Sequence, residues 1–186
     1  VFRQILNLVD RRLFEKRVRE HQGDYRSKGL SCWDLLVTMV FCQMAGAKSL
    51  REISQGLRSC EGKLELLGMK SAGGASTLSY ANGHRPWKIF EATFYDALRQ
   101  VEGLAPKKKF KFKNKLFSLD ATVIELCCTM FDWAKFRTTK GAIKLHALLD
   151  HDGYFPVFAH ISDGKKADVK VAWDLELPAG SIVAMD

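Results

Sequence analysis

The stretch LFSLDATVI, residues 116–124, decides the fold of the second half of the chain. It is rich in apolar and β-branched residues, a composition typical of a β-strand. Asp120 lies in its middle, where a carboxylate is unfavourable unless it is paired, hydrogen-bonded or bound to a metal ion. The stretch therefore predicts a strand and marks Asp120 as a candidate functional residue.

The residues after this stretch continue the β pattern. Residues 142–149 and 154–161 are two further strand candidates, joined by the turn sequence DHDG. A short helix is expected at 167–176, and a last strand at 181–185 leads into Asp186. Strand, strand, strand, helix, strand is the order of a ribonuclease-H-like sheet, in which the first and fourth strands are adjacent and parallel. We therefore expect Asp120 and Asp186 to lie side by side.

Two neighbouring carboxylates repel each other unless a cation neutralises them. Mg²⁺ and Mn²⁺ prefer oxygen ligands, and a pair of such ions activates water and stabilises a charged phosphoryl transition state. Asp120 and Asp186 are therefore the predicted catalytic and metal-binding residues. Zinc is an alternative suggested by His146, His151 and His160 near Asp150 and Asp152, but a turn explains these residues equally well and tetrahedral ligand spacing is absent.

The charge of the chain is unevenly distributed. Residues 1–115 carry 22 Lys and Arg against 11 Asp and Glu, whereas residues 116–186 carry 7 against 10. A basic half attracts phosphate by counterion release, and an acidic half can hold divalent cations. A basic protein with an uneven surface is the other interpretation, and charge alone does not separate the two.

The first hundred residues predict a helical bundle. Apolar residues recur at helical spacing over residues 2–13, Ser31 is placed to cap an apolar helix over 32–47, and Ser49 with Glu52 begins a short helix. Pro86 precedes a further helix, whose expected buried face carries Trp87, Phe90, Phe94, Leu98 and Val101.

Small hydroxyl and amide side chains lie between these two last helices, in the segment STLSYAN at residues 76–82. Two short helices separated by a turn, the second of them rich in Ser, Thr and Asn, are compatible with a helix-turn-helix, although the turn is longer than usual, and a capping and loop region of an ordinary bundle is the competing interpretation. The predicted DNA-binding residues of this half are Arg51, Ser76, Thr77, Ser79, Asn82 and Arg85.

Residues 106–115 form the clearest boundary, with six lysines and two phenylalanines in ten positions. We expect a helical DNA-binding domain at 1–105, a basic linker at 106–115 and a catalytic region at 116–186. Such a run also occurs in solvated linkers and at edge strands. The DNA contacts predicted here and in the following domain are made by Lys107, Lys108, Lys109, Lys111, Lys113, Lys140 and Lys144.

Composition excludes several classes of protein. The 47% of hydrophobic and 27% of charged residues suit a globular domain, and no apolar run reaches the roughly 18 residues of a membrane span. We therefore expect a cytoplasmic protein of class α+β, with a helical bundle followed by part of a ribonuclease-H-like domain. The five cysteines form no C-x-x-C pair and predict neither a zinc ribbon nor a disulfide framework.

Three segments together resemble the DDE transposases of bacterial insertion sequences, most closely the insertion sequence four group. They are SLDATVI at 118–124, the block from Lys140 through KLH at 144–146 to Asp150, and IVAMD at 182–186. The segment 76–82 ahead of Arg85 also looks like the N-terminal DNA-binding region of that group. The resemblance implies that Asp120 and Asp186 match the first and second metal-binding aspartates of the family.

The resemblance implies DNA transposition by metal-dependent strand cleavage and strand transfer. Its expected partners are transposon ends and target DNA, its cofactor is a pair of Mg²⁺ or Mn²⁺ ions, and a homodimer is a possible arrangement in the DNA complex. The glutamate that supplies the family's third ligand is not among these residues, so we expect this chain to be part of a longer protein and inactive by itself. Rival functions are a non-enzymatic DNA-binding regulator, a decayed transposase remnant, and a nuclease on the same sheet.

Overall fold

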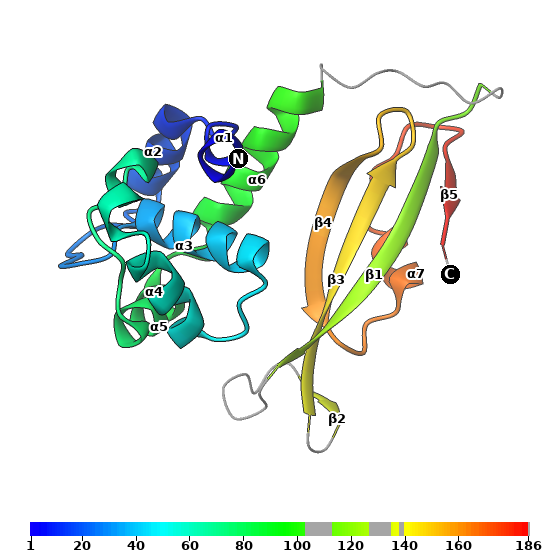
Figure 1. Ribbon diagram of the computed structural model, residues 1–186. Coiled ribbons are helices and arrows are strands. Elements are labelled where there is room, and N and C mark those ends of the chain that lie inside the picture. The colour runs from blue at the N-terminus through cyan, green and yellow to red at the C-terminus, as the bar shows by residue number, and fades with distance from the viewer. Residues whose placement is uncertain (103–112, 127–134, 138–139, 186) are drawn as a thin grey trace. The chain divides into compact units, whose positions relative to one another are not determined.

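The computed structural model describes residues 1–102, 113–126, 135–137 and 140–185. The chain divides into two compact units, Val1–Ala97 and Leu98–Asp186. The first unit is helical and the second is built on a sheet (Figure 1), so the predicted α+β class is confirmed. Within the described ranges, no helix combines the length and the hydropathy that crossing a lipid bilayer requires.

The helical unit packs its helices around the first half of α3 (Cys32–Ala45). Cys32, Leu35 and Val37 are buried there, and Leu57 and Leu78 approach them from neighbouring helices. The remaining helical elements are α1 (Phe2–Leu6), α2 (Arg11–Glu20), α4 (Leu50–Arg58), the 3₁₀ helix η1 (Glu61–Leu67), α5 (Ala75–His84) and α6 (Trp87–Glu102). This unit therefore has a core of its own, made from residues that are far apart in sequence.

The helical spacing over residues 2–13 is divided between two helices. α1 ends at Leu6, and α2 begins at Arg11. Asp10 causes the new start, because its side chain accepts hydrogen bonds from the backbone N–H groups of Arg12 and Leu13 and so caps α2. Apolar periodicity alone did not reveal this break.

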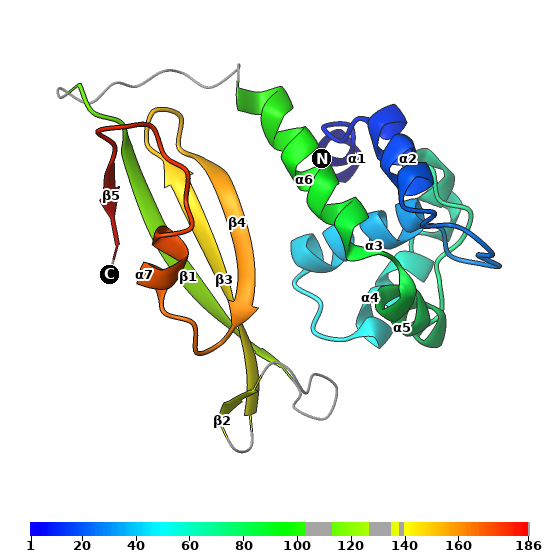
Figure 2. The ribbon, with the colours of Figure 1, turned by 180° about the vertical axis from the view of Figure 1, so that it is seen from behind.

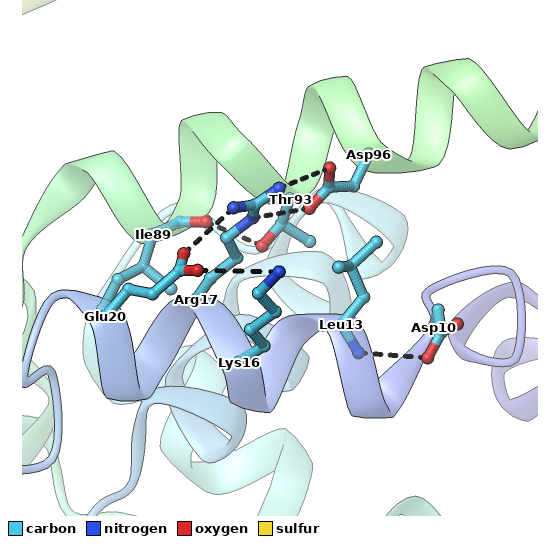
Figure 3. A network of polar contacts seen from close by, with 8 residues as sticks. All are labelled: Asp10, Leu13, Lys16, Arg17, Glu20, Ile89, Thr93 and Asp96. Atoms are coloured by element: carbon cyan, nitrogen blue, oxygen red, sulfur yellow. Dashed lines mark hydrogen bonds and ion pairs between the residues drawn. The ribbon is translucent and has the colours of Figure 1, made fainter.

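The buried face of α6 differs from the predicted one. Trp87 and Phe94 are 63% and 38% exposed, whereas Ile89, Thr93 and Asp96 are buried. Figure 3 shows the reason, which is that Arg17 of α2 donates two hydrogen bonds to the Asp96 carboxylate, at 2.9 and 3.0 Å. The ion pair directs a polar side chain of α6 toward α2. The predicted face was chosen from apolar residues alone, so it did not contain Asp96.

The second unit contains a five-stranded mixed sheet. β1 (Leu116–Leu126) pairs antiparallel with β3 (Lys140–Asp150), and β3 also pairs with β2 (Lys135–Arg137) and β4 (Phe155–Asp163). The three long strands confirm the three strands predicted at 116–124, 142–149 and 154–161. The helix predicted at 167–176 is shorter, since α7 spans Asp168–Ala172, and the last strand, β5, spans Ile182–Ala184.

β5 lies beside β1 and runs parallel to it. α7 and the chain that follows it lie against one face of the sheet (Figures 1 and 2), where Ala172, Leu175 and Leu177 pack on Phe117 and Leu148. The neighbouring parallel strands predicted from the element order are therefore present, and they set the position of Asp120.

Candidate functional site

Asp120 lies on the face of the sheet opposite α7. Side chains alternate along β1, and Phe117 and Leu119 enter the core beneath α7, so Ser118 and Asp120 are on the other face. The Asp120 side chain is exposed, and its Oδ1 accepts a hydrogen bond of 2.8 Å from the backbone N–H of Ala121. The carboxylate is accessible to solvent, so the expectation of an unfavourable, buried position for Asp120 is wrong, and its exposure alone does not mark it as functional.

The pairing of β1 with β5 ends close to both aspartates in sequence. Leu116 pairs with Ile182 and Ser118 with Ala184, and a backbone hydrogen bond of 2.8 Å joins Ile182 N–H to the Lys115 carbonyl. Asp120 and Asp186 each follow the last of these pairs by two residues. Asp186 itself lies outside the described residues, so the predicted distance between the two carboxylates stays a prediction.

Asp120 is suited to bind magnesium or manganese, because its exposed carboxylate, two residues beyond the last pair of β1 with β5, offers hard oxygen donors. Among the described residues, no group of three His, Cys, Asp or Glu side chains is close enough to hold a metal ion. Of the two predicted metal ligands, the described residues therefore include Asp120, and Asp186 stays a prediction.

Lys144 and His146 lie on the covered face of the sheet, away from Asp120. The Nζ of Lys144 is 2.8 Å from the Oδ1 of Asp168 in α7, and the Nδ1 of His146 is 2.9 Å from the same oxygen. His146 is fully buried and its Nε2 forms a hydrogen bond of 2.8 Å with the Ser162 hydroxyl. The four side chains link α7 to β3 and β4, a role that the sequence did not reveal.

The pKa of His146 lies below its ordinary value of 6.5. Burial is the largest cause, and the nearby Lys144 and His160 act in the same direction against the Asp168 carboxylate. His146 is therefore neutral in the folded protein near neutral pH.

The other residues of the zinc alternative have local roles. Asp150 accepts a hydrogen bond of 2.8 Å from the backbone N–H of Asp152 within the turn, and its other oxygen is 3.4 Å from Lys115 Nζ. His151 contacts the Ser118 hydroxyl at 2.6 Å. These contacts fit a turn that closes the β3–β4 hairpin.

The predicted DNA-binding residues of the helical unit divide into two groups. Ser79 and Asn82 are exposed on α5, and Arg51 is exposed at the start of α4. Ser76, Thr77 and Arg85 instead line a groove between α5 and the segment at residues 21–30. α4 and α5 are separated by η1 and its flanking loops, a longer connection than a helix-turn-helix uses.

This groove has a volume of about 870 Å³. Sequence reasoning did not find it, although Tyr25, Arg26, Tyr80 and His84 are aromatic and basic residues of the kind that bind nucleic acid. These aromatic and basic residues are divided between two segments some fifty residues apart in sequence. Only the packing of α5 against the helical core brings the two segments together.

The lysines of the basic linker fall mostly outside the description of the structure. Lys113 is exposed, while Lys107, Lys108, Lys109 and Lys111 lie outside the described residues. The Lys140 side chain also lies outside them. The DNA contacts assigned to these lysines stay predictions.

Residues 1–70 match the family model DUF4372, a domain of unknown function. The match covers α1 to α4 and η1, which form most of the helical unit. No curated protein and no solved structure matches the chain.

Proposed function

We propose that this chain is the DNA-binding and partial catalytic region of a DDE-type transposase, which cuts and joins DNA with Mg²⁺ or Mn²⁺. The observation that carries the proposal is the parallel pairing of β1 with β5, in a register that ends two residues before Asp120 and Asp186. Residues 1–70 add support, since they match a domain found in transposase-like proteins.

The ribonuclease-H-like fold is part of this proposal. β3 lies between β1 and β4, β5 is parallel to β1, and α7 precedes β5 in the chain, as that fold requires. In such a sheet, metal-bound carboxylates gather where the parallel strands end. Asp120 and Asp186 would hold ions that activate water and stabilise the phosphoryl transition state.

The basic helical unit supplies the affinity for DNA in this proposal. The excess of Lys and Arg over Asp and Glu lies entirely in residues 1–115. Duplex DNA is thereby attracted to the part of the chain that precedes the sheet. A regulator that binds DNA without cutting it would share this property, so metal binding by Asp120 is the property that separates the two functions.

The test is a Mn²⁺ titration of the 186-residue chain, followed by electron paramagnetic resonance. Asp120→Asn should weaken Mn²⁺ binding by more than about tenfold, because even the loss of a second-shell partner weakens metal sites by 10- to 100-fold. Asp174→Asn is the matched control, since Asp174 is 72% exposed and lies outside the proposed site. Equal Mn²⁺ affinity in the two variants would contradict the proposal that Asp120 binds a metal ion, and it would favour the non-enzymatic alternative.

A duplex-nicking assay completes the test. The chain should bind labelled duplex without cutting it in Mg²⁺ or Mn²⁺, because two carboxylates leave one ion under-coordinated. Nicking that disappears in Asp120→Asn would instead show that another residue of this chain completes the site.

A further inference from the structure

The groove between residues 21–30 and α5 has a chemistry that the proposed function does not use. Its lining contains the cations Arg26, Lys28 and Arg85, and Asp24 of the same loop lies 3.7 Å from Arg85, which leaves Arg26 and Lys28 as the cations without that ion pair. It also contains two exposed tyrosines, Tyr25 and Tyr80, which are 66% and 63% exposed. Cations and exposed aromatic rings are the combination that binds the phosphates and bases of a nucleic-acid strand.

The aromatic rings are already arranged for stacking. Tyr80 and His84 lie one turn apart on α5 with ring centroids 3.9 Å apart and planes 16° from parallel. The Nδ1 of His84 is 2.8 Å from the Tyr80 carbonyl, which holds the imidazole in place. Across the groove, the Arg26 guanidinium lies 5.1 Å from the centre of the Tyr25 ring. A flat base can therefore extend an existing stack.

The opposite wall of the groove is held rigidly by Arg85. Its Nη2 donates hydrogen bonds to the Ser27 hydroxyl at 2.6 Å and to the Leu30 carbonyl at 2.7 Å, and the Arg85 side chain is only 10% exposed. The same loop is anchored at Gly23, where a Cβ atom would come within 2.4 Å of the Ile89 side chain. Gln22 and Arg26 adopt positive φ angles of 51° and 54°. A wall fixed in this way loses little conformational entropy when a ligand binds.

The shape of the groove favours an unpaired nucleotide over a duplex. A recognition helix must project freely to enter a major groove about 12 Å wide. The face of α5 that carries Thr77, Tyr80 and His84 instead looks across a gap onto residues 21–30. The volume of about 870 Å³ falls in the range of roughly 300–1,000 Å³ that is usual for small-ligand sites, enough for one or two nucleotides and too small for a base-paired helix.

We propose that this groove binds an unpaired nucleotide of a DNA strand. The base stacks on Tyr80, and the adjoining phosphate lies against Arg26 and Lys28. The proposal rests on the DNA-binding role proposed above and deepens it, because it assigns the groove to single-stranded DNA. Ser79 and Asn82, which lie on α5 outside the groove, remain available for duplex DNA.

The experiment measures the binding of the 186-residue chain to a fluorescent oligothymidylate of about ten nucleotides and, in parallel, to a labelled duplex. Tyr80→Ala should weaken single-strand binding by roughly 5- to 100-fold, the range for loss of one stacked base. Tyr80→Phe should bind as the parent does. Arg26→Gln should weaken binding and reduce the salt slope by about 0.7, the value for one single-strand phosphate contact.

Trp87→Ala is the matched control, because Trp87 is an equally exposed aromatic residue just outside the groove. It should change single-strand affinity by less than about twofold. Photocrosslinking of a bromodeoxyuridine oligonucleotide to the unmodified chain gives a readout that requires no variant to fold. The crosslinked peptide should contain Tyr80 or Tyr25.

Single-strand binding that survives Tyr80→Ala, or crosslinks confined to other segments, would overturn the proposal. A loss of duplex binding equal to the loss of single-strand binding would also overturn it, while leaving the proposed transposase function in place. Failure of the parent chain to bind duplex at any salt concentration would count against the proposed function, whatever the single-strand measurement shows.

Discussion

For His146, the role inferred from the sequence differs from the role that the structure shows. In the sequence it is one of three histidines near two aspartates, a pattern that permits a metal site. In the structure it is fully buried between Ser162 and Asp168 and links the sheet to α7. Its Nδ1 lies 2.9 Å from the Asp168 carboxylate.

The lowered pKa of His146 predicts that acid destabilises the second unit. As the pH is lowered past 6.5, the unfolded chain binds a proton at this residue before the folded protein does. The free energy of unfolding therefore decreases as the pH is lowered, until the lower pKa of the folded protein is reached. The slope should be at most about 1.4 kcal/mol per pH unit. Thermal unfolding between about pH 5 and pH 8 should show this slope in the parent chain.

His146→Gln should be less stable near pH 8 and should show a flatter pH dependence, because glutamine does not titrate. The groups that face His146 are Lys144, His160, Ser162 and Asp168, and all of them stay in place in this variant. His84→Gln, an exposed substitution on α5, should keep the parent slope. An unchanged slope in His146→Gln would contradict the assignment.

At the scale of elements, the start of α3 decides the packing of the helical unit. The Ser31 hydroxyl accepts a hydrogen bond from Asp34 N–H at 3.1 Å, and the Asp34 carboxylate accepts one from Ser31 N–H at 2.9 Å. The sequence predicted Ser31 as the cap, and the structure confirms it as part of a capping box. Because Cys32 and Trp33 follow directly in the core, this cap positions the most buried turn of the unit.

Ser31→Ala should lower the free energy of unfolding by about 1 to 2 kcal/mol, the upper part of the range for N-cap substitutions. The upper part applies because Asp34 is only 5% exposed and would lose hydrogen bonds to the missing hydroxyl. Ser31→Thr keeps the cap and should remain close to the parent. Urea unfolding of the three proteins measures the difference, and equal midpoints for the alanine and threonine variants would contradict the prediction.

At the scale of the whole molecule, positive and negative charge are concentrated in different parts of the chain. The basic excess belongs to residues 1–115 and the acidic excess to residues 116–186, where Asp120 and Asp186 are found. This division is consistent with the proposed function, in which residues 1–115 bind DNA and residues 116–186 bind divalent cations.

Replacing Lys107, Lys108, Lys109, Lys111 and Lys113 by glutamine should weaken binding to any duplex and flatten the salt dependence. Each lost phosphate contact lowers the slope by roughly 0.9. A matched variant removes five exposed lysines elsewhere, at positions 63, 70, 88, 165 and 170, and so has the same net charge. Equal salt slopes for the two variants would show that net charge alone matters and that residues 107–113 serve only as a linker.

The sequence by itself determined the local structure and the order of the elements. β-Branched runs predicted the three long strands, serine caps predicted the starts of α3 and α4, and the element order predicted that β1 and β5 are parallel neighbours. These features depend on local propensity and on the alternation of side chains, both of which can be read from consecutive residues.

Only the tertiary structure decided which polar side chains meet. Arg17 is paired with Asp96, Lys144 with Asp168, and residues 21–30 with α5 across the groove, each between segments separated in sequence. Apolar periodicity misplaced the buried face of α6 for the same reason, since the partner of Asp96 lies 79 residues earlier. An ion pair or a groove depends on the path of the chain through space, and no local pattern encodes that path.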